Sequence, residues 1–309
     1  MWKNKIFLAH MSMIITTMIY ALNYTIAKTI MPDPFDSSTL VFIRLLVATL
    51  LFFFIFKFFV NQKIKWRQHG IAFILASITG VVINTLFFFK GLSLSKPIDA
   101  SIIMSLTPII TFIFAVAIGT EKPSIFAILG ALIAFTGLYT LITGFSFHLP
   151  NISFGNILLF INMTAYAAYL IYIKKLTGEY NAITITFYTF LFALPVVAMV
   201  GFDGLNNFSW HALNTDNWLA LGFVVIFVTV FTYLLIVFSA KHLKASVLGF
   251  YTYLQPVFTI GFALAIGSDT LSPLDGLSAV LVMVGLILIN RTRTMPRKVY
   301  TSAEKITPR

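Results

Sequence analysis

Apolar runs long enough to cross a bilayer recur along the whole chain and are separated by short polar segments. A transmembrane helix needs roughly 20 mostly apolar residues. The sequence contains ten such runs, at about 6–27, 38–60, 70–89, 98–118, 124–143, 155–174, 182–202, 217–239, 245–266 and 273–290. No separator between these runs is long enough for a soluble domain. The pattern therefore predicts an all-α integral membrane protein with ten transmembrane helices.

The composition strengthens this prediction. Of the 309 residues, 59% are hydrophobic and 10% are charged, whereas soluble domains carry about 25% charged residues. The mean hydropathy is +0.94. A soluble protein of this size has no means of burying so much apolar surface, so we expect the lipid bilayer to surround the chain. The first run is too long for a signal peptide and lacks a small-residue cleavage site, so we expect it to be retained.

The basic residues are placed so that they predict an orientation. The net charge is +11, which by itself would suggest a nucleic-acid partner. With ten spans both termini share one side of the membrane, and that side holds 17 of the 21 Lys and Arg residues. The opposite side holds Lys28, Lys90 and Lys96. Because basic residues accumulate in cytoplasmic loops, we expect both termini in the cytoplasm, a plasma (bacterial inner) membrane location and no nucleic-acid partner.

One apolar stretch occurs twice. PIITFIFAVAIGTE at 108–121 and PVFTIGFALAIGSD at 256–269 are identical at seven of fourteen positions. Tyr20 matches Tyr166 at an offset of 146, and Gly137 matches Gly285 at an offset of 148. The repeat unit is five spans, and an odd number of spans turns the second copy upside down. The sequence thus predicts inverted five-helix repeats at 6–143 and 155–290 with a basic cytoplasmic tail at 291–309, an organisation typical of alternating access.

These features resemble the EamA family of the drug/metabolite transporter superfamily, over nearly the whole chain. The residues that carry the resemblance are Arg44, Pro108, Glu121, Gly130, Gly137, Pro256, Asp269 and Gly285. One departure is Asp269, where glutamate would be more usual. The resemblance implies a ten-helix transporter with cytoplasmic termini that moves small organic solutes, often by export.

Arg44 is the sharpest single candidate for a functional residue. It lies about six residues into the second span, roughly 9 Å from its outer end at 1.5 Å per residue. A charge at that depth is costly and usually faces a cavity or a partner. Arg44 either contacts an acidic group of the solute or a gate residue, or it is a structural arginine satisfied by backbone carbonyls. The second repeat has no charge at the corresponding place.

Prolines interrupt the fourth and ninth spans. Pro108 and Pro256 remove a backbone donor, and we expect each to kink its helix. Ser101 and Ser105 precede the first proline, and Tyr253 precedes the second, at helical spacing. Either these prolines bend as part of the mechanism beside a solute path, or they only shape the helices for packing.

Other polar and aromatic residues lie away from the span ends. Such groups need partners in hydrocarbon, which are either neighbouring helices or a solute. As a set they are the predicted lining of a solute path: Tyr20, Asn23, Asn84, Asn162, Tyr166, Tyr169, Thr229, Thr232, Tyr233, Tyr251 and Gln255.

The span boundaries offer two further hypotheses. Glu121 and Asp269 end corresponding spans of the two repeats, and each is either a gate acid or a plain loop acid. Small residues of the fifth span, from Ala127 to Gly137, allow close packing. That packing is either within the chain or in a homodimer, and both readings stay open.

Several residue types are absent from the span centres. No Asp, Glu or His lies there, so a conventional proton relay is not expected. The absence of cysteine excludes disulfides and thiolate metal sites, and the sequence has neither H-E-x-x-H nor G-x-S-x-G. We expect no enzyme activity, no metal and no cofactor. The predicted function is secondary transport of small organic metabolites, with export of amino acids or related compounds first and a nucleoside, sugar or drug-like solute second. A channel and a non-transporting membrane partner are the remaining alternatives.

Overall fold

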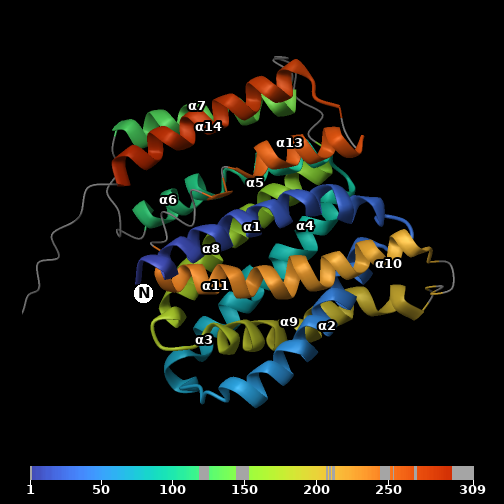
Figure 1. Cartoon of the computed structure of the whole chain (residues 1–309). Helices are drawn as coiled ribbons and strands as arrows, with labels where there is room; N and C mark the ends of the chain where they lie inside the picture. The colour runs from blue at the N-terminus through green and yellow to red at the C-terminus, as the bar shows by residue number, and fades with distance from the viewer. Residues whose placement is uncertain are drawn as a thin grey trace, which may run out of the picture.

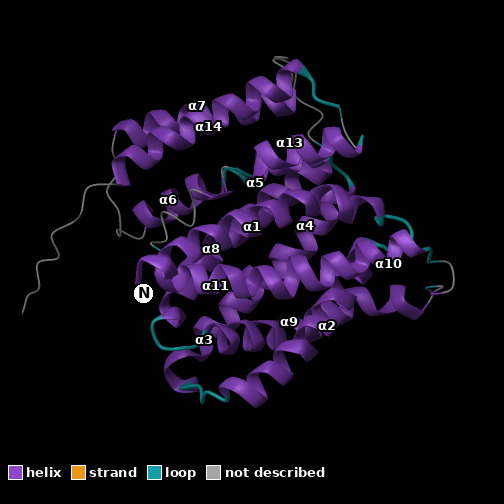
Figure 2. Cartoon of the chain, in the orientation of Figure 1, coloured by secondary structure: helices purple, strands orange, loops and turns teal. Residues whose placement is uncertain are grey.

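A bundle of helices forms the whole described part of the molecule (Figure 1). The computed structural model describes residues 2–117, 125–143, 153–206, 208, 210, 213–243, 251–252, 254–267 and 270–293. Figure 2 shows helices and connecting loops, and none of these described residues lies in a strand. The all-α prediction is therefore confirmed. The arrangement of ten helices as two inverted repeats stays a prediction.

The first half of the chain contains both continuous and broken helices. Their bounds are α1 Trp2–Thr29, α2 Ser37–Ile55 with η1 Phe56–Val60, α3 Trp66–Ser77 with η2 Ile78–Ile83 and α4 Asn84–Ser93, α5 Pro97–Met104, α6 Thr107–Ala117 and α7 Ile125–Thr143. The η segments are π-helical and continue the helices on either side of them. Between α5 and α6 the helix is interrupted at Ser105 and Leu106, just before Pro108.

The second half has a similar order of elements. Their bounds are α8 Phe154–Thr177, α9 Ala182–Asn206, α10 Thr215–Gly222 with η4 Phe223–Phe231 and α11 Thr232–His242, α13 Gln255–Ile266 and α14 Pro273–Arg293. Every apolar run predicted from the sequence overlaps at least one of the helices of the two halves. In the ninth run the described helix α13 starts at Gln255, because residues 244–250 and 253 lie outside the described part.

Local sequence signals explain several of these boundaries. Asp36 accepts a hydrogen bond from the backbone N–H of Ser38 and so caps the start of α2. Pro97 stands in the first turn of α5, where its missing N–H costs nothing. Gly267 ends α13 with a φ of 70°, a conformation that glycine adopts without strain.

The helices have the length and the surface that lipid requires. Six helical segments are long and apolar enough to cross a membrane: Lys5–Thr29, Ser37–Val60, Trp66–Leu94, Pro97–Phe114, Ala182–Leu205 and Thr215–Ile236. Large apolar side chains point outward along them, and Phe59 and Met199 are each 82% exposed. In water such a surface would be unfavourable, whereas hydrocarbon accommodates it.

Helices α7 and α14 form a pair at one edge of the bundle (Figure 1). Glycines permit their close approach, because a Cβ on Gly137 would lie 2.9 Å from the carbonyl oxygen of Ser278. A Cβ on Gly285 would lie 2.3 Å from the carbonyl oxygen of Gly130. At the repeat offset of 148, Ser278 is the match of Gly130 and Gly285 is the match of Gly137. Each helix therefore contacts the other through the same stretch of its repeat. Reciprocal contact of this kind is what a two-fold relation produces.

Candidate functional site

Arg44 lies in the interior of the bundle, on α2. Its side chain is only 6% exposed. The Nε–H donates to Thr229 Oγ1 of η4 at 3.0 Å, and the guanidinium carbon lies 4.8 Å from the centre of the Phe89 ring. A guanidinium has five N–H donors. In the described part of the chain, the four donors on its two terminal nitrogens form no hydrogen bond, and no Asp or Glu interacts with it.

Tyrosines from two other helices lie near this guanidinium, and a tyrosine of a third helix lies near them. Tyr20 of α1 and Tyr233 of α11 lie close to Arg44. Thr232 Oγ1 is hydrogen-bonded to the Tyr20 hydroxyl at 3.2 Å, which connects α1 to α11. Tyr166 of α8 lies close to both Tyr20 and Tyr233.

A second tyrosine of α8 completes the group. The rings of Tyr166 and Tyr169 stack with centroids 5.8 Å apart. Tyr169 is packed closely against η2, since a Cβ on Gly80 would lie 2.1 Å from its ring. The hydroxyls of Tyr166, Tyr169 and Tyr233 have no hydrogen-bond partner among the described residues. We call Arg44, Tyr20, Tyr166, Tyr169, Thr229, Thr232 and Tyr233 the Arg44–tyrosine cluster.

The cluster draws on both halves of the chain. Tyr20 and Tyr166 occupy matching positions in the two predicted repeats, yet only the first half supplies a charge. Near the matching position for Arg44 is Phe190, whose ring meets Tyr233 at 4.9 Å. In the predicted repeats the cluster therefore has one matched pair of tyrosines and a charge without a counterpart.

The asparagines named from the sequence form no hydrogen bond to the cluster in the described structure. Asn162 of α8 donates its amide N–H to the backbone carbonyl of Asn84, which joins α8 to α4. The carbonyl oxygen of the Asn162 side chain is buried without a partner in the described structure, and so is that of Asn23. The Asn162–Asn84 contact is a bond between helices, and the two oxygens remain available to other groups.

The serines before Pro108 are bonded within their own helix. Ser101 Oγ donates to the carbonyl of Ile98 at 2.8 Å, and Ser105 Oγ donates to that of Ile102 at 2.7 Å. Neither is part of the Arg44–tyrosine cluster.

The predicted residues around the ninth run are separate from the cluster as well. The Tyr251 hydroxyl lies 2.5 Å from Nδ1 of His10 on α1. Gln255 and Pro256 stand in the first turn of α13, a short way after the helical residues 251 and 252. Tyr253, Glu121 and Asp269 lie outside the described residues.

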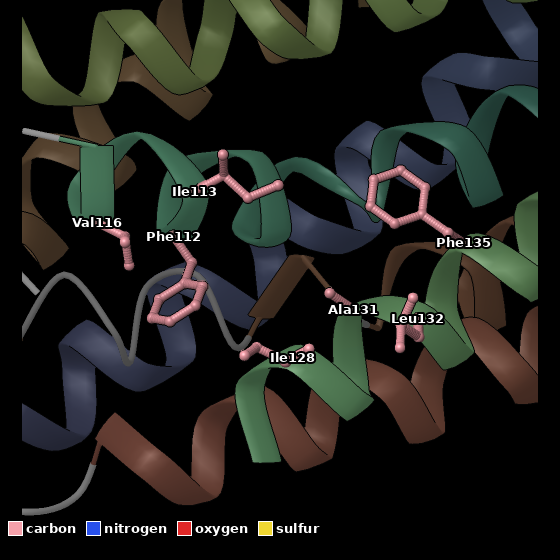
Figure 3. A pocket seen from close by; sticks show the side chains of 7 residues that line it. All are labelled: Phe112, Ile113, Val116, Ile128, Ala131, Leu132 and Phe135. Carbon is pink, nitrogen blue, oxygen red and sulfur yellow. The ribbon is translucent and has the colours of Figure 1, made fainter. Parts of the chain in front are cut away.

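An apolar pocket of about 300 Å³ lies between α6 and α7 (Figure 3). Its walls are formed by Phe112, Ile113, Val116, Ile128, Ala131, Leu132 and Phe135. None of these side chains carries a polar group, so the pocket has nothing to orient a polar solute. It contains none of the predicted site residues.

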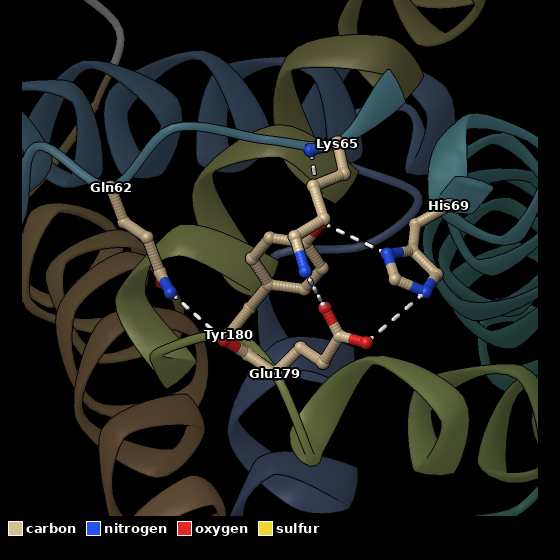
Figure 4. Close-up of polar contacts among 5 residues, drawn as sticks. All are labelled: Gln62, Lys65, His69, Glu179 and Tyr180. Atoms are coloured by element: carbon tan, nitrogen blue, oxygen red, sulfur yellow. Dashed lines mark hydrogen bonds and ion pairs between the residues drawn. The ribbon is translucent and has the colours of Figure 1, made fainter. Parts of the chain in front are cut away.

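Polar contacts join the two halves at one end of the bundle (Figure 4). Gln62, in the loop after η1, donates to the carbonyl of Glu179 at 2.9 Å. Its side-chain oxygen accepts from the backbone N–H of Asn181 at 2.8 Å and from the Thr184 hydroxyl at 3.1 Å. A single glutamine thus binds the loop between α8 and α9 twice and the first turn of α9 once.

Charged and aromatic side chains reinforce this contact. Lys65 Nζ is 3.0 Å from the Glu179 carboxylate, and His69 Nε2 is 3.7 Å from it. The Tyr180 hydroxyl accepts from the backbone N–H of Lys65 at 3.1 Å and lies 2.9 Å from Nδ1 of His69. The hydrogen bond from Lys65 lowers the pKa of Glu179 below its ordinary value. We call Gln62, Lys65, His69, Glu179 and Tyr180 the polar loop cluster.

Aromatic contacts join the halves at the opposite end (Figure 1). Phe35, between α1 and α2, is fully buried and stacks on Phe208 with centroids 4.5 Å apart. Trp210 meets Phe208 at 4.9 Å, and Trp218 of α10 lies 5.9 Å from Trp210. We call Phe35, Phe208, Trp210 and Trp218 the aromatic loop cluster.

Some residues of these sites escaped sequence reasoning. Tyr24 and Phe89 flank the Arg44–tyrosine cluster. The sequence could have identified Tyr24, because it stands one helical turn after Tyr20 and so shares a helix face with it. The contacts among Gln62, Glu179 and Tyr180 could not be predicted, because their loops are far apart in the sequence. Among the described residues no group of three or more His, Asp or Glu is placed to hold a metal ion.

The long apolar helices define the chain as an integral membrane protein. Its residues 7–143 and 153–291 match the EamA-like transporter family, to which the chain therefore belongs. The resemblance seen in the sequence is thereby confirmed. The two matched segments lie close to the bounds of the predicted repeats.

Individual relatives agree on the class. An "Uncharacterized transporter YyaM" of Bacillus subtilis (strain 168) is 25% identical over 247 residues, which is 79% of this chain and 80% of the relative. An "Uncharacterized transporter" of Archaeoglobus fulgidus is 23% identical over 218 residues, 69% of this chain and 73% of the relative. A solved crystal structure matches the fold with a TM-score of 0.64 and 15% identity, covering 95% of this chain and 99% of its own.

Proposed function

We propose that this chain is a secondary transporter that moves a small organic metabolite across the membrane by alternating access. Export of amino acids or related compounds that carry an acidic group is the first expectation, and a nucleoside, sugar or drug-like solute is the second. The observation that carries the proposal is Arg44, a buried guanidinium between the two halves with four N–H donors unused within the described structure.

Two inverted repeats, 6–143 and 155–290, are the moving parts in this proposal. The reciprocal glycine contacts of α7 and α14 support such a two-fold relation. Contacts between the halves at both ends support it further, because alternating access requires one contact to open while the other holds. The polar and aromatic loop clusters occupy those two ends.

The membrane orientation follows from the charges. We place both termini and the polar loop cluster in the cytoplasm, since Lys63, Lys65 and Arg67 belong to the basic side. We place the aromatic loop cluster outside. The chain has no cysteine, so single cysteines at positions 121 and 269 report directly on this placement. The first should be labelled from the cytoplasm and the second from outside, and labelling from one side only would refute the inverted repeat.

Counterflow into proteoliposomes tests the transport function itself. The purified protein is given a mixed pool of amino acids, nucleosides and sugar phosphates, and the exchanged species are identified by mass spectrometry. Saturable exchange of one chemical class separates a carrier from a channel and from a non-transporting partner. Arg44→Ala should abolish or sharply weaken this exchange while folded protein remains in the membrane. Unchanged exchange would remove Arg44 from the solute site.

The small residues of the fifth span bear on the homodimer hypothesis. Gly130, Ala134 and Gly137 contact α14 of the same chain. Their close packing is therefore used within the chain, and a homodimer stays a prediction without a surface assigned to it.

A further inference from the structure

If the proposed transport function holds, charge balance in the Arg44–tyrosine cluster favours acidic compounds without an ammonium over the amino acids of the first expectation. The guanidinium is 6% exposed and lies in a part of the bundle surrounded by apolar helices. Its neighbours are neutral: Thr229, Phe89 and the tyrosines. A buried charge without a partner is strongly unfavourable. The missing partner is one negative charge.

The same cluster offers no carboxylate to a positive group of the solute. Asp and Glu residues of the described structure lie in loops or near helix ends, and none of them interacts with Arg44 or with the cluster tyrosines. An amino acid that enters as a zwitterion would bring its ammonium into this region without a carboxylate to bind it. A solute with one carboxylate and no ammonium leaves no charge uncompensated.

The aromatic side chains of the cluster suit a flat apolar body beside that charge. Tyr166 and Tyr169 stack on each other, and Phe190 packs against Tyr233. Aromatic side chains favour contact with a further ring, edge to face or offset-stacked. The unpartnered hydroxyls of Tyr166 and Tyr169 supply additional donors for the carboxylate.

We propose that the transported solute is an organic monoanion with a planar or aromatic body, and that the membrane potential drives its export without a coupled ion. Arg44 neutralises the anion, so the loaded cluster has no net charge. The sequence places no Asp, Glu or His at a span centre, so no side chain there is suited to carry a proton along. A potential negative inside acts on the anion itself and favours the outside.

Three probes with the same phenylethyl body test the charge requirement in the full-length protein. They are 3-phenylpropanoate with one negative charge, phenylalanine with both charges, and 2-phenylethylamine with one positive charge. Each is measured by its effect on the melting temperature and by uptake into proteoliposomes. We expect 3-phenylpropanoate to bind about tenfold or more tightly than phenylalanine. The buried ammonium of phenylalanine would lose a hydrogen bond to a charged group, and the loss of one such bond weakens binding by about that factor or more.

A potassium diffusion potential set with valinomycin, at equal pH on both sides, tests the driving force. For one charge, 100 mV corresponds to about 50-fold accumulation of the anion on the positive side. Preference for phenylalanine or 2-phenylethylamine, or accumulation that does not respond to the potential, would overturn this proposal. If none of the three probes is bound while the mixed pool is exchanged, the monoanion proposal fails and the transport function stands. If the mixed pool is not exchanged either, the transport function fails with it.

Arginine variants separate binding from a structural role. Arg44→Gln should lose the preference for 3-phenylpropanoate over phenylalanine, whereas Arg44→Lys should retain part of it. A structural defect would weaken all probes equally and leave the ratio between them unchanged. Lys57→Gln is the matched control, because it removes an exposed positive charge from the same predicted span without touching the cluster. An altered ratio in Lys57→Gln would contradict the assignment to Arg44.

Discussion

The polar loop cluster and the aromatic loop cluster hold the two halves of this protein together at opposite ends by different chemistry. In the proposed repeats the two clusters occupy matching places. Gln62 and Phe208 follow the second and seventh predicted spans, while Tyr180 and Phe35 follow the sixth and the first. One end is joined by hydrogen bonds and ion pairs, and the other by stacked rings.

This difference predicts unequal ease of opening. Water replaces exposed polar contacts at small net cost, since each hydrogen bond contributes only about 0.5–1.5 kcal/mol. Opening the aromatic end instead exposes Phe35, which is fully buried. We therefore expect the polar end to open first and to respond to salt and pH, and the aromatic end to respond to neither.

The largest expected effect comes from the aromatic end. Phe35→Ala should lower the free energy of unfolding by about 3–5 kcal/mol, the usual range for a buried phenylalanine. Thermal unfolding of the purified protein measures this change. Phe59→Ala is the control, because the same atoms are removed from a side chain that is 82% exposed. Equal losses in the two variants would contradict the role of the aromatic loop cluster.

A smaller effect is expected at the polar end. Gln62→Ala removes three hydrogen bonds, two to the α8–α9 loop and one to Thr184 of α9, and should cost about 1–3 kcal/mol. The readout is maleimide labelling of Ile185→Cys, a position that is 1% exposed and becomes reachable when this end opens. Labelling should accelerate in Gln62→Ala and not in Gln68→Ala, whose side chain is exposed. Unchanged labelling would show that Gln62 does not hold this end closed.

Glu179 should have a weaker influence, and one that depends on salt. The Lys65–Glu179 pair is largely exposed, and salt screens such pairs. Glu179→Gln should accelerate labelling of Ile185→Cys at low salt, and the difference from the parent should vanish at high salt. Phe35 stacking should show no salt dependence, as measured by thermal unfolding at both salt concentrations. A difference that persists at high salt would exclude an ionic origin.

The smallest effect is expected from pH. Because the pKa of Glu179 is lowered from 4.5, its ion pairs contribute stability above that value and lose it as the pH falls through the lowered pKa. The polar end should therefore stay closed at neutral and mildly acidic pH and loosen only below 4.5. Labelling of Ile185→Cys across a pH series measures this. Loosening close to neutral pH would contradict the role given to Glu179.

The pattern of apolar runs was sufficient to locate the helices. Each predicted run overlaps a helix. In the hydrocarbon core of a bilayer, a segment of about 20 residues forms a helix because only then are its backbone N–H and C=O groups hydrogen-bonded within the segment. Interruptions inside the helices were less predictable. Pro108 signalled a break that falls just before it, whereas the π-helical segments η2 and η4 have no comparable residue signal.

The residues of the candidate site were partly visible in the sequence. Arg44 stood out because a charge within an apolar run has few explanations. Tyr20, Tyr166 and Tyr233 were in the predicted lining, but so were Tyr251 and Ser101, which lie elsewhere. Helical periodicity places residues on one face of one helix and says nothing about which faces of distant helices meet.

By itself the sequence determined the class of this protein: a helical membrane chain with two similar halves and one buried arginine. These features depend on local sequence, because the free energy of moving an apolar run from water into lipid is set mainly by the side chains of that run. Only the tertiary structure decided which tyrosines surround Arg44 and which loops close the two ends. Those contacts join residues such as Arg44 and Thr229, 185 positions apart, and depend on how complete helices pack against one another.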